Sequence, residues 1–196
     1  MPESRRLFSV SKILLVESDS AVAQAIEAIL RPHVEVLLTV ADGQQALEVW
    51  RTEGPDIVLT EIHVPGIDGL SLSEQVREID NDAPVIVISS SLDSEHLRRA
   101  IEIGVNSYVY KPVDPVLLLD AVKRCMSEHQ RSMDLRMARM VFEVANEGIL
   151  ITDERSRILA VNPAFSEITG YRPDEIVGQS TRMLSSGVHS RDFYRA

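Results

Sequence analysis

Residues 55–69 read PDIVLTEIHVPGIDG, and this stretch decides how the rest of the chain is interpreted. Its apolar run over 57–60 has the length and the β-branched content of a buried strand. An amphipathic helix is predicted directly downstream, over 70–79. Glu61 follows the run at once, so we expect a carboxylate at the carboxyl end of a buried strand.

The same alternation extends outward in both directions from this stretch. Further strands are predicted over 12–16, 34–40, 85–89 and 107–110, and further helices over 20–30, 43–50 and 94–103. A last helix begins after Pro112, with Asp114 as its N-cap and Pro115 at its first position. Five strands alternating with five helices predict an α/β fold, a parallel sheet with helices on both faces.

The residues that follow the predicted strands form one chemically coherent set. The first strand is followed by Glu17, Ser18 and Asp19, the third by Glu61, the fourth ends at Ser89, and the fifth is followed by Lys111. Because the carboxyl ends of parallel strands meet at one edge of a sheet, we expect these groups to converge there. Acidic, hydroxyl and ammonium groups together suit a cation and a phosphoryl group.

Five motifs in order carry a family resemblance: ILLVE at 13–17, PDIVL at 55–59, VPGIDG at 64–69, PVIVIS at 84–89 and YVYKP at 108–112. With them, residues 11–128 resemble the receiver domain of bacterial two-component response regulators. The resemblance implies a flavodoxin-like five-stranded parallel sheet of strand order 2-1-3-4-5, cytoplasmic location and a role in a phosphorelay.

The resemblance also implies roles for individual positions. Receivers carry an aspartate where Glu61 stands here, and that aspartate accepts a phosphoryl group with the help of Mg²⁺. By position, Ser89 and Lys111 would contact the phosphate, and Tyr108 would be the aromatic that rotates inward as the surface rearranges.

Two positions depart from the receiver pattern. Glu61 replaces the phospho-acceptor, and Ser18 replaces one of two acidic residues that help hold the metal. The extra methylene of a glutamate moves its carboxylate by about 1.5 Å, and a misplacement of about 1 Å can cost on the order of a hundredfold in rate. We therefore expect a degenerate receiver, with Glu17, Asp19 and Glu61 as candidate ligands of a weak or absent Mg²⁺ site.

The sequence leaves four interpretations of Glu61 open. It can hold one conformational state through a permanent contact with Lys111, or it can satisfy a buried lysine without selecting a state. Alternatively, the receiver retains phosphorylation and is a working Mg²⁺-dependent phospho-receiver, with Asp19 or Asp56 as a substitute acceptor. The fourth interpretation is that Glu61 is an engineered replacement of the natural residue.

A helix is predicted from residue 115 to residue 145, overlapping the last helix of the receiver. Four apolar residues recur every seven positions: Leu119, Met126, Met133 and Met140. Each is followed, three or four residues later, by one residue of a second set: Val122, His129, Met137 and Val144. This heptad pattern predicts a signalling helix that forms a parallel coiled-coil homodimer. The alternative is a helix that packs back on its own domain.

Residues 138–196 resemble the N-terminal part of a PAS domain. The resemblance lies in ANEGILITD at 145–153, RILAVNPAF at 157–165, ITGY at 168–171 and DEIVG at 174–178. We expect a truncated PAS segment whose half sheet leaves Ile149, Ile151 and Val161 exposed. The later stretch RMLSSGVHSRDFY, at 182–194, resembles PAS segments of cyclic-di-GMP signalling proteins.

No cofactor is expected in the PAS segment. Thr181 stands where light-sensing relatives carry the cysteine that reacts with flavin, so a flavin adduct is excluded. Haem would need an axial histidine, and His189 is the sole histidine of this region.

Composition limits the remaining functions. Residues 1–120 carry a net charge of −11 within a total of −10, which argues against nucleic-acid binding by that half. No apolar run reaches the roughly 18 residues of a membrane span, and the single Cys125 fits a reducing compartment. We predict a non-enzymatic regulatory fragment that meets a sensor kinase or another signalling protein. Its output lies outside the chain. The first candidate for this output is cyclic-di-GMP turnover, and the second is a histidine kinase. A plain dimerisation scaffold is the alternative to a regulatory fragment.

Overall fold

The computed structural model describes residues 12–91 and 93–184. The chain divides into two compact units, Met1–Ser132 and Met133–Ala196. Each unit has a hydrophobic core of its own among the described residues.

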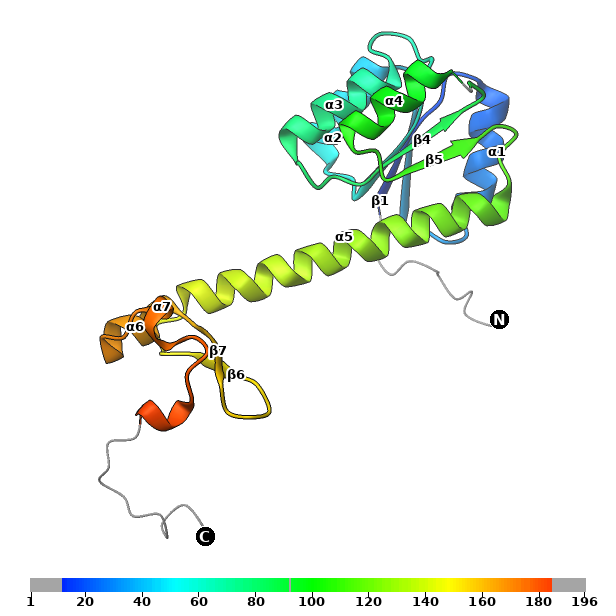
Figure 1. The fold of residues 1–196 in the computed structure, drawn as a ribbon. Helices are drawn as coiled ribbons and strands as arrows, with labels where there is room; N and C mark the ends of the chain where they lie inside the picture. The colour runs from blue at the N-terminus through cyan, green and yellow to red at the C-terminus, as the bar shows by residue number, and fades with distance from the viewer. Residues whose placement is uncertain (1–11, 92, 185–196) are drawn as a thin grey trace. The chain divides into compact units, whose positions relative to one another are not determined.

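The first unit contains a five-stranded parallel sheet of order β2-β1-β3-β4-β5, as predicted. Its strands β1, β4 and β5 are labelled in Figure 1. The strands are β1 (Lys12–Val16), β2 (Val36–Val40), β3 (Ile57–Glu61), β4 (Val85–Ser89) and β5 (Ser107–Tyr110). β2 begins two residues later than predicted, while Val34 is still buried in the turn before it. β3 extends one residue further, so Glu61 itself belongs to the strand.

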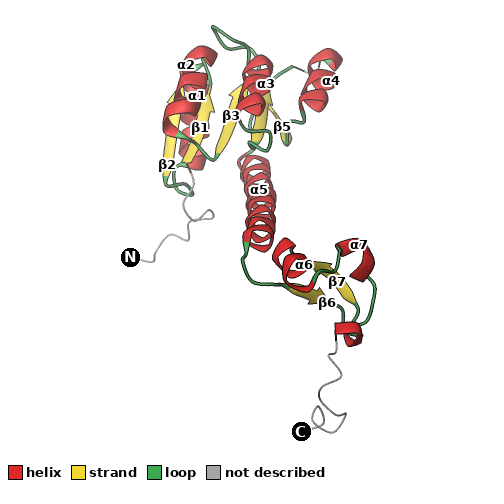
Figure 2. Cartoon of the chain, turned by 90° about the vertical axis from the view of Figure 1, so that its left-hand side faces the viewer, coloured by secondary structure: helices red, strands yellow, loops and turns green. Residues whose placement is uncertain are grey.

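Helices cover both faces of this sheet (Figure 2). They are α1 (Ser20–Leu30), α2 (Gly43–Glu53), α3 (Gly69–Ile79), α4 (Ser94–Ile103) and the start of α5 (Pro115–Val144). α1 and α5 pack on the face that carries Ile13 and Leu15, whereas α2 and α3 pack on the face that carries Leu14 and Val16. Because both faces are covered, the central strands read as continuous apolar runs.

Aspartates begin all five of these helices. Amides of the first turn donate hydrogen bonds to the capping side chain in each case, which satisfies donors that a helix leaves unpaired; the caps are Asp19, Asp42, Asp68, Asp93 and, as predicted, Asp114. Asp68 fixes the start of α3 directly after β3. At that point Gly69 comes so close to the backbone that an added Cβ would lie 2.0 Å from the Glu61 carbonyl oxygen.

The heptad seam of α5 divides between two environments. Val122 is fully buried in the core of the first unit, and Leu119 and Met126 pack partly against it. His129 hydrogen-bonds the Asp82 carbonyl oxygen at 3.1 Å. The upstream seam therefore packs back on its own domain, as the alternative interpretation held, and only its downstream positions remain exposed.

The second unit pairs β6 (Leu150–Thr152) with β7 (Ile158–Val161) as an antiparallel hairpin. It is followed by α6 (Pro163–Thr169), α7 (Pro173–Ile176) and a 3₁₀ turn, η1 (Thr181–Leu184). The predicted exposure of Val161 is wrong, because Val161 packs with Phe165 and Ile176 and is 8% exposed. Ile149 is half-buried, and Ile151 is exposed as expected.

Asn162 joins the parts of the second unit. Its fully buried side chain accepts hydrogen bonds from the amides of Ile149 and Phe165, at 2.8 and 3.0 Å. It donates to the carbonyl oxygens of Ala145 and Glu147, at 3.3 and 2.9 Å. One amide group thus connects the end of α5, the approach to β6 and the start of α6.

Within the described ranges, no helix is long and apolar enough to cross a membrane.

Candidate functional site

The predicted site lies at the carboxyl edge of the parallel sheet. Strand register places Val16 beside Thr60, Glu61 beside Ile88, and Ser89 beside Tyr110. The Lys111 amide continues this pattern by donating to the Ser89 carbonyl oxygen at 3.0 Å. Residues from four strand ends therefore meet, which confirms the convergence expected from the topology.

Lys111 is the centre of the site. Its Nζ lies 2.5 Å from Glu61 Oε2 and 2.6 Å from Glu17 Oε2. The Lys111 side chain is 17% exposed, and the side chains of Glu17 and Glu61 are 2% and 7% exposed. One ammonium therefore bridges two carboxylates that are almost completely removed from water.

The remaining oxygens of both carboxylates are also engaged. Glu61 Oε1 accepts the amides of Ile62 and His63, at 2.7 and 3.3 Å. Glu17 Oε1 accepts the Asp19 amide at 3.0 Å. Both side chains are thus fixed by hydrogen bonds at each oxygen.

The pKa values of the bridged pair favour charge on both partners. Burial alone would raise the pKa of Glu61, but the hydrogen bond and charge of Lys111, helped by the Ser89 hydroxyl and the Ile62 amide, hold it below its usual range. Burial likewise opposes charge on Lys111, yet Glu17 and Glu61 raise its pKa above the usual value. Both shifts favour the charged forms of Glu61 and Lys111.

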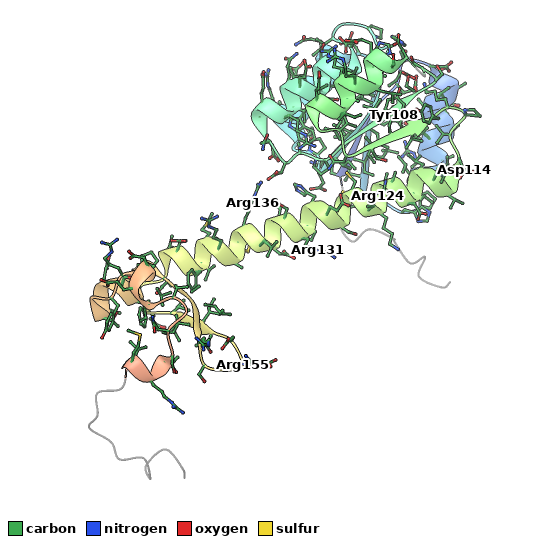
Figure 3. The ribbon with its side chains drawn as sticks, in the orientation of Figure 1. Tyr108, Asp114, Arg124, Arg131, Arg136 and Arg155 are labelled. Carbon is green, nitrogen blue, oxygen red and sulfur yellow. The ribbon has the colours of Figure 1, made fainter. Side chains whose placement is uncertain are left out.

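Tyr108 extends the network to the loop before α4. Its hydroxyl donates to the Ser91 carbonyl oxygen at 2.9 Å, and the Ser91 amide donates to Ser89 Oγ at 3.2 Å. Burial raises the pKa of Tyr108, and electrostatic interactions with Tyr110 and Glu61 raise it further. A hydrogen bond with Ser89 opposes this rise. Tyr108 is labelled on β5 in Figure 3.

Two of the sequence-predicted residues stay outside this cluster. Asp19 is exposed and serves as the N-cap of α1, where its Oδ1 accepts the amides of Ala21 and Val22 at 2.9 and 3.2 Å. Ser18 is exposed as well. The structure therefore gives Asp19 a structural role at a helix end.

The carboxylates do not fit a divalent cation in this arrangement. Such an ion wants several oxygens directed at a common point, whereas Glu17 and Glu61 are directed at Lys111 and at backbone amides. Across residues 12–91 and 93–184, no group of three or more His, Cys, Asp and Glu is placed to hold a metal.

Sequence reasoning missed three contacts at this edge. Glu17, predicted as a candidate ligand of a weak or absent metal site, is the second partner of Lys111 in the structure. The rings of His63 and His96 meet edge to face with centroids 5.3 Å apart, and His96 Nδ1 lies 3.2 Å from Ser91 Oγ. The position of His63, two residues after Glu61, was the one available signal for the histidine pair.

In the second unit, Thr181 begins η1 and Arg182–Leu184 completes it. His189 and the rest of the 185–196 segment lie outside the described residues.

Family models match both parts of the chain. The response regulator receiver domain model matches residues 13–123, and a PAS domain model matches residues 136–194.

Individual relatives match the chain over different lengths. The transcriptional regulatory protein CseB of Streptomyces avermitilis is 33% identical over 111 residues, which cover 57% of this chain and 47% of CseB. The sensor histidine kinase TmoS of Ectopseudomonas mendocina is 25% identical over a longer match, covering 89% of this chain and 22% of TmoS. The chain thus spans less than half of either relative.

Among solved structures, the signal receiver domain of a modulated diguanylate cyclase from Desulfovibrio desulfuricans G20 is similar. It has 25% sequence identity and a TM-score of 0.58, and the match covers 63% of this chain and 99% of that one.

Proposed function

Because the chain belongs to the response regulator receiver domain family and continues into a PAS domain, we propose that it is a signalling regulator whose receiver is held in one state by its own side chains. The observation that carries the proposal is the bridge of Lys111 to Glu61 and Glu17, at 2.5 and 2.6 Å. In this proposal Glu61 takes the place of the phosphate as the partner of Lys111.

Several features support a receiver that does not accept phosphate. The carboxylate at the acceptor position is longer by one methylene, and its Oε2 is already paired with Lys111. Ser18 supplies no carboxylate, and Asp19 is committed to the start of α1. We propose that the site works without Mg²⁺, because the ammonium of Lys111 neutralises the carboxylates that the ion would need.

The experiment is phosphorylation by acetyl phosphate and Mg²⁺, read by intact-protein mass spectrometry. We expect no adduct on the natural chain. The double variant Glu61→Asp with Ser18→Asp restores the receiver pattern and serves as the matched control, and we expect it to gain one phosphoryl group. A stable adduct of one phosphoryl group on the natural chain would overturn the proposal.

We infer that the signal passes along α5 to the PAS segment and then to an output outside the chain, so that any enzyme activity belongs to that output. Our first candidate is cyclic-di-GMP turnover. Two similarities support it: the motif at 182–194 and the likeness to the receiver of a diguanylate cyclase.

A histidine kinase output is the second candidate, because the match to TmoS runs through both parts of the chain. The downstream coding sequence separates the two outputs.

We further propose that the regulator is a cytoplasmic homodimer joined through α5, with a sensor kinase or another signalling protein as its input. Support comes from the exposed methionines at the downstream end of α5, Met133, Met137 and Met140. Light scattering on the full chain and on a chain ending at residue 132 tests the dimer, which we expect only for the full chain. A dimer of both chains would place the interface elsewhere.

A further inference from the structure

Two histidines meet beside the Lys111 bridge without taking part in it. His63 follows β3, and His96 lies in the first turn of α4. Their ring centroids are 5.3 Å apart, and the ring planes are inclined by 67°. His63 is exposed and His96 is partly buried, so ions in solution can reach the pair. The proposed function makes no use of these two imidazoles.

The separation of the two rings is that of two imidazoles bound to one tetrahedral metal ion. In a zinc site each Zn–N bond is about 2.0–2.1 Å long. The centre of an imidazole ring lies about 1.1–1.2 Å behind the bound nitrogen, so a tetrahedral angle at the metal sets two ring centres about 5.2 Å apart. The histidine pair matches this separation at 5.3 Å. Imidazole is a ligand that suits zinc, copper and nickel ions.

Ser91 holds His96 in an orientation that suits a metal ligand. Ser91 Oγ lies 3.2 Å from His96 Nδ1. The same oxygen accepts the Asp93 amide at 3.2 Å, and a hydroxyl oxygen can accept two hydrogen bonds. When the His96 Nδ1–H group donates the second of them, Nε2 carries the lone pair that can bind a metal. Histidine ligands are commonly fixed in this way through the ring nitrogen that does not bind the ion.

His63 is the ring that can turn toward this nitrogen. Its amide donates to Glu61 Oε1 at 3.3 Å, which fixes the backbone, while its side chain is exposed. The torsion about the Cβ–Cγ bond of a histidine is broad. Rotation about that bond turns the ring nearly about its own centre. A nitrogen of His63 can therefore be directed at the ion that His96 Nε2 binds, with the centroid distance kept.

We propose that His63 and His96 bind one divalent transition-metal ion. Within the described parts of the chain, no third His, Cys, Asp or Glu completes a metal-binding group with the pair. The neighbouring Glu95 carboxylate is already paired with Arg98, at 2.5 Å. Water therefore supplies the remaining ligands, and the ion is held by two protein ligands alone.

The bound ion would join two segments at the carboxyl edge of the sheet. His63 belongs to the backbone that holds Glu61 Oε1, and His96 contacts Ser91, whose carbonyl oxygen accepts the Tyr108 hydroxyl. The metal would thus restrain the edge that the Lys111 bridge also fixes. The proposal goes beyond the proposed function and is independent of it, because the bridge needs no metal.

The test is titration of the full chain with Zn²⁺ at pH 7.5, followed by calorimetry. Half the binding free energy of a four-ligand zinc finger corresponds to a Kd on the order of 10 µM, and we expect one ion per chain at about this affinity. His63→Ala and His96→Ala should each weaken binding about a hundredfold or more, since each removes a ligand. Ser91→Ala should weaken it about tenfold, whereas Ser91→Thr, which keeps the hydroxyl, should bind as the natural chain does.

Two further variants are the matched controls. His33→Ala and His189→Ala each remove an imidazole outside the pair, so Zn²⁺ should bind them as it binds the natural chain. Zn²⁺ should also raise the urea midpoint of the natural chain, read by Trp50 emission, and leave that of His63→Ala unchanged. The midpoint without metal checks that each variant folds.

The results separate this proposal from the proposed function. Undiminished Zn²⁺ binding by either pair variant, or the absence of binding to the natural chain at ten times the expected Kd, would overturn the metal site. A phosphoryl adduct on the natural chain would overturn the proposed function and leave the metal site standing.

Discussion

The substitution Lys111→Met tests the bridge that the proposed function depends on. It keeps the length of the side chain and removes the ammonium, so two carboxylates that are 2% and 7% exposed lose their cation. Removing one partner of a buried ion pair costs about 3–5 kcal/mol. That is a large part of the roughly 5–15 kcal/mol by which a domain is stable.

The assay is urea unfolding of the full chain at pH 7, followed by the emission of Trp50. Trp50 is the single tryptophan and is 7% exposed on α2, so it reports on the receiver alone. With a denaturant slope of about 2 kcal/mol per M, a loss of 3 kcal/mol lowers the midpoint by about 1.5 M. Lys12→Met is the matched control, because Lys12 pairs with an exposed Glu53 and its loss should cost under about 1 kcal/mol.

The pH dependence of Lys111→Met gives an independent check. In the natural chain, folding lowers the pKa of Glu61. Glu61 therefore stabilises the fold at any pH above its pKa in the unfolded chain, and this stabilisation is lost as the pH falls through its pKa in the folded chain. Without Lys111, burial raises that pKa instead, and the cost of the variant should be largest near neutral pH and shrink in acid. Adding Glu17→Gln and Glu61→Gln should recover most of the loss at pH 7. An unfolding midpoint equal to that of the Lys12 control, or a loss that is the same at pH 4.5 and pH 7, would refute the reasoning.

Three further predictions concern other parts of the fold. Asn162→Ala leaves the amides of Ile149 and Phe165 without acceptors, and we expect it to destabilise the second unit by about 2–3 kcal/mol, measured by faster hydrogen exchange of the Ile149 amide. Gly69→Ala places a Cβ 2.0 Å from the Glu61 carbonyl oxygen, so unfolding by urea should show a loss of about 1–3 kcal/mol; an unchanged midpoint would contradict the close approach. Burial raises the pKa of the Cys125 thiol to about 12, so a thiol reagent at pH 8 should label it only in urea, and rapid labelling of the folded chain would contradict its burial.

The fold and the gathering of the site could be predicted from the sequence because both follow from topology. Once alternating apolar runs and helices imply a parallel sheet, residues after its strands must meet at one edge. Glu61, Ser89 and Lys111 were found together for this reason, by position alone. Their convergence did not depend on which rotamers they adopt.

The partners within the site could not be predicted in the same way. Glutamate and lysine have long, flexible side chains, and which carboxylate takes the single ammonium depends on distances of an ångström or two. The sequence therefore offered Glu17 and Asp19 only as candidate ligands of a weak or absent metal site. It did not show that Glu17 pairs with Lys111 or that the Asp19 side chain caps α1. The packing partner of the upstream heptad positions could not be predicted either. Periodicity shows that Val122 faces an apolar surface, but it does not show whether that surface belongs to the receiver or to a second helix.

In the proposed function, the contact of Lys111 with two carboxylates would make phosphorylation of this receiver unfavourable. A phosphoryl group on Glu61 would add about −1.5 to −2 charges at the sheet edge, and it would draw Lys111 away from Glu17. Glu17, whose side chain is 2% exposed, would then be a buried carboxylate without a cation. A metal ion could supply the missing positive charge, but the oxygens it would need are directed at Lys111 and at the amides of Ile62, His63 and Asp19. Under this proposal, phosphorylation of Glu61 would break one buried charge pair for each one that it forms, and the chain would keep the state that the contact of Glu61 with Lys111 defines.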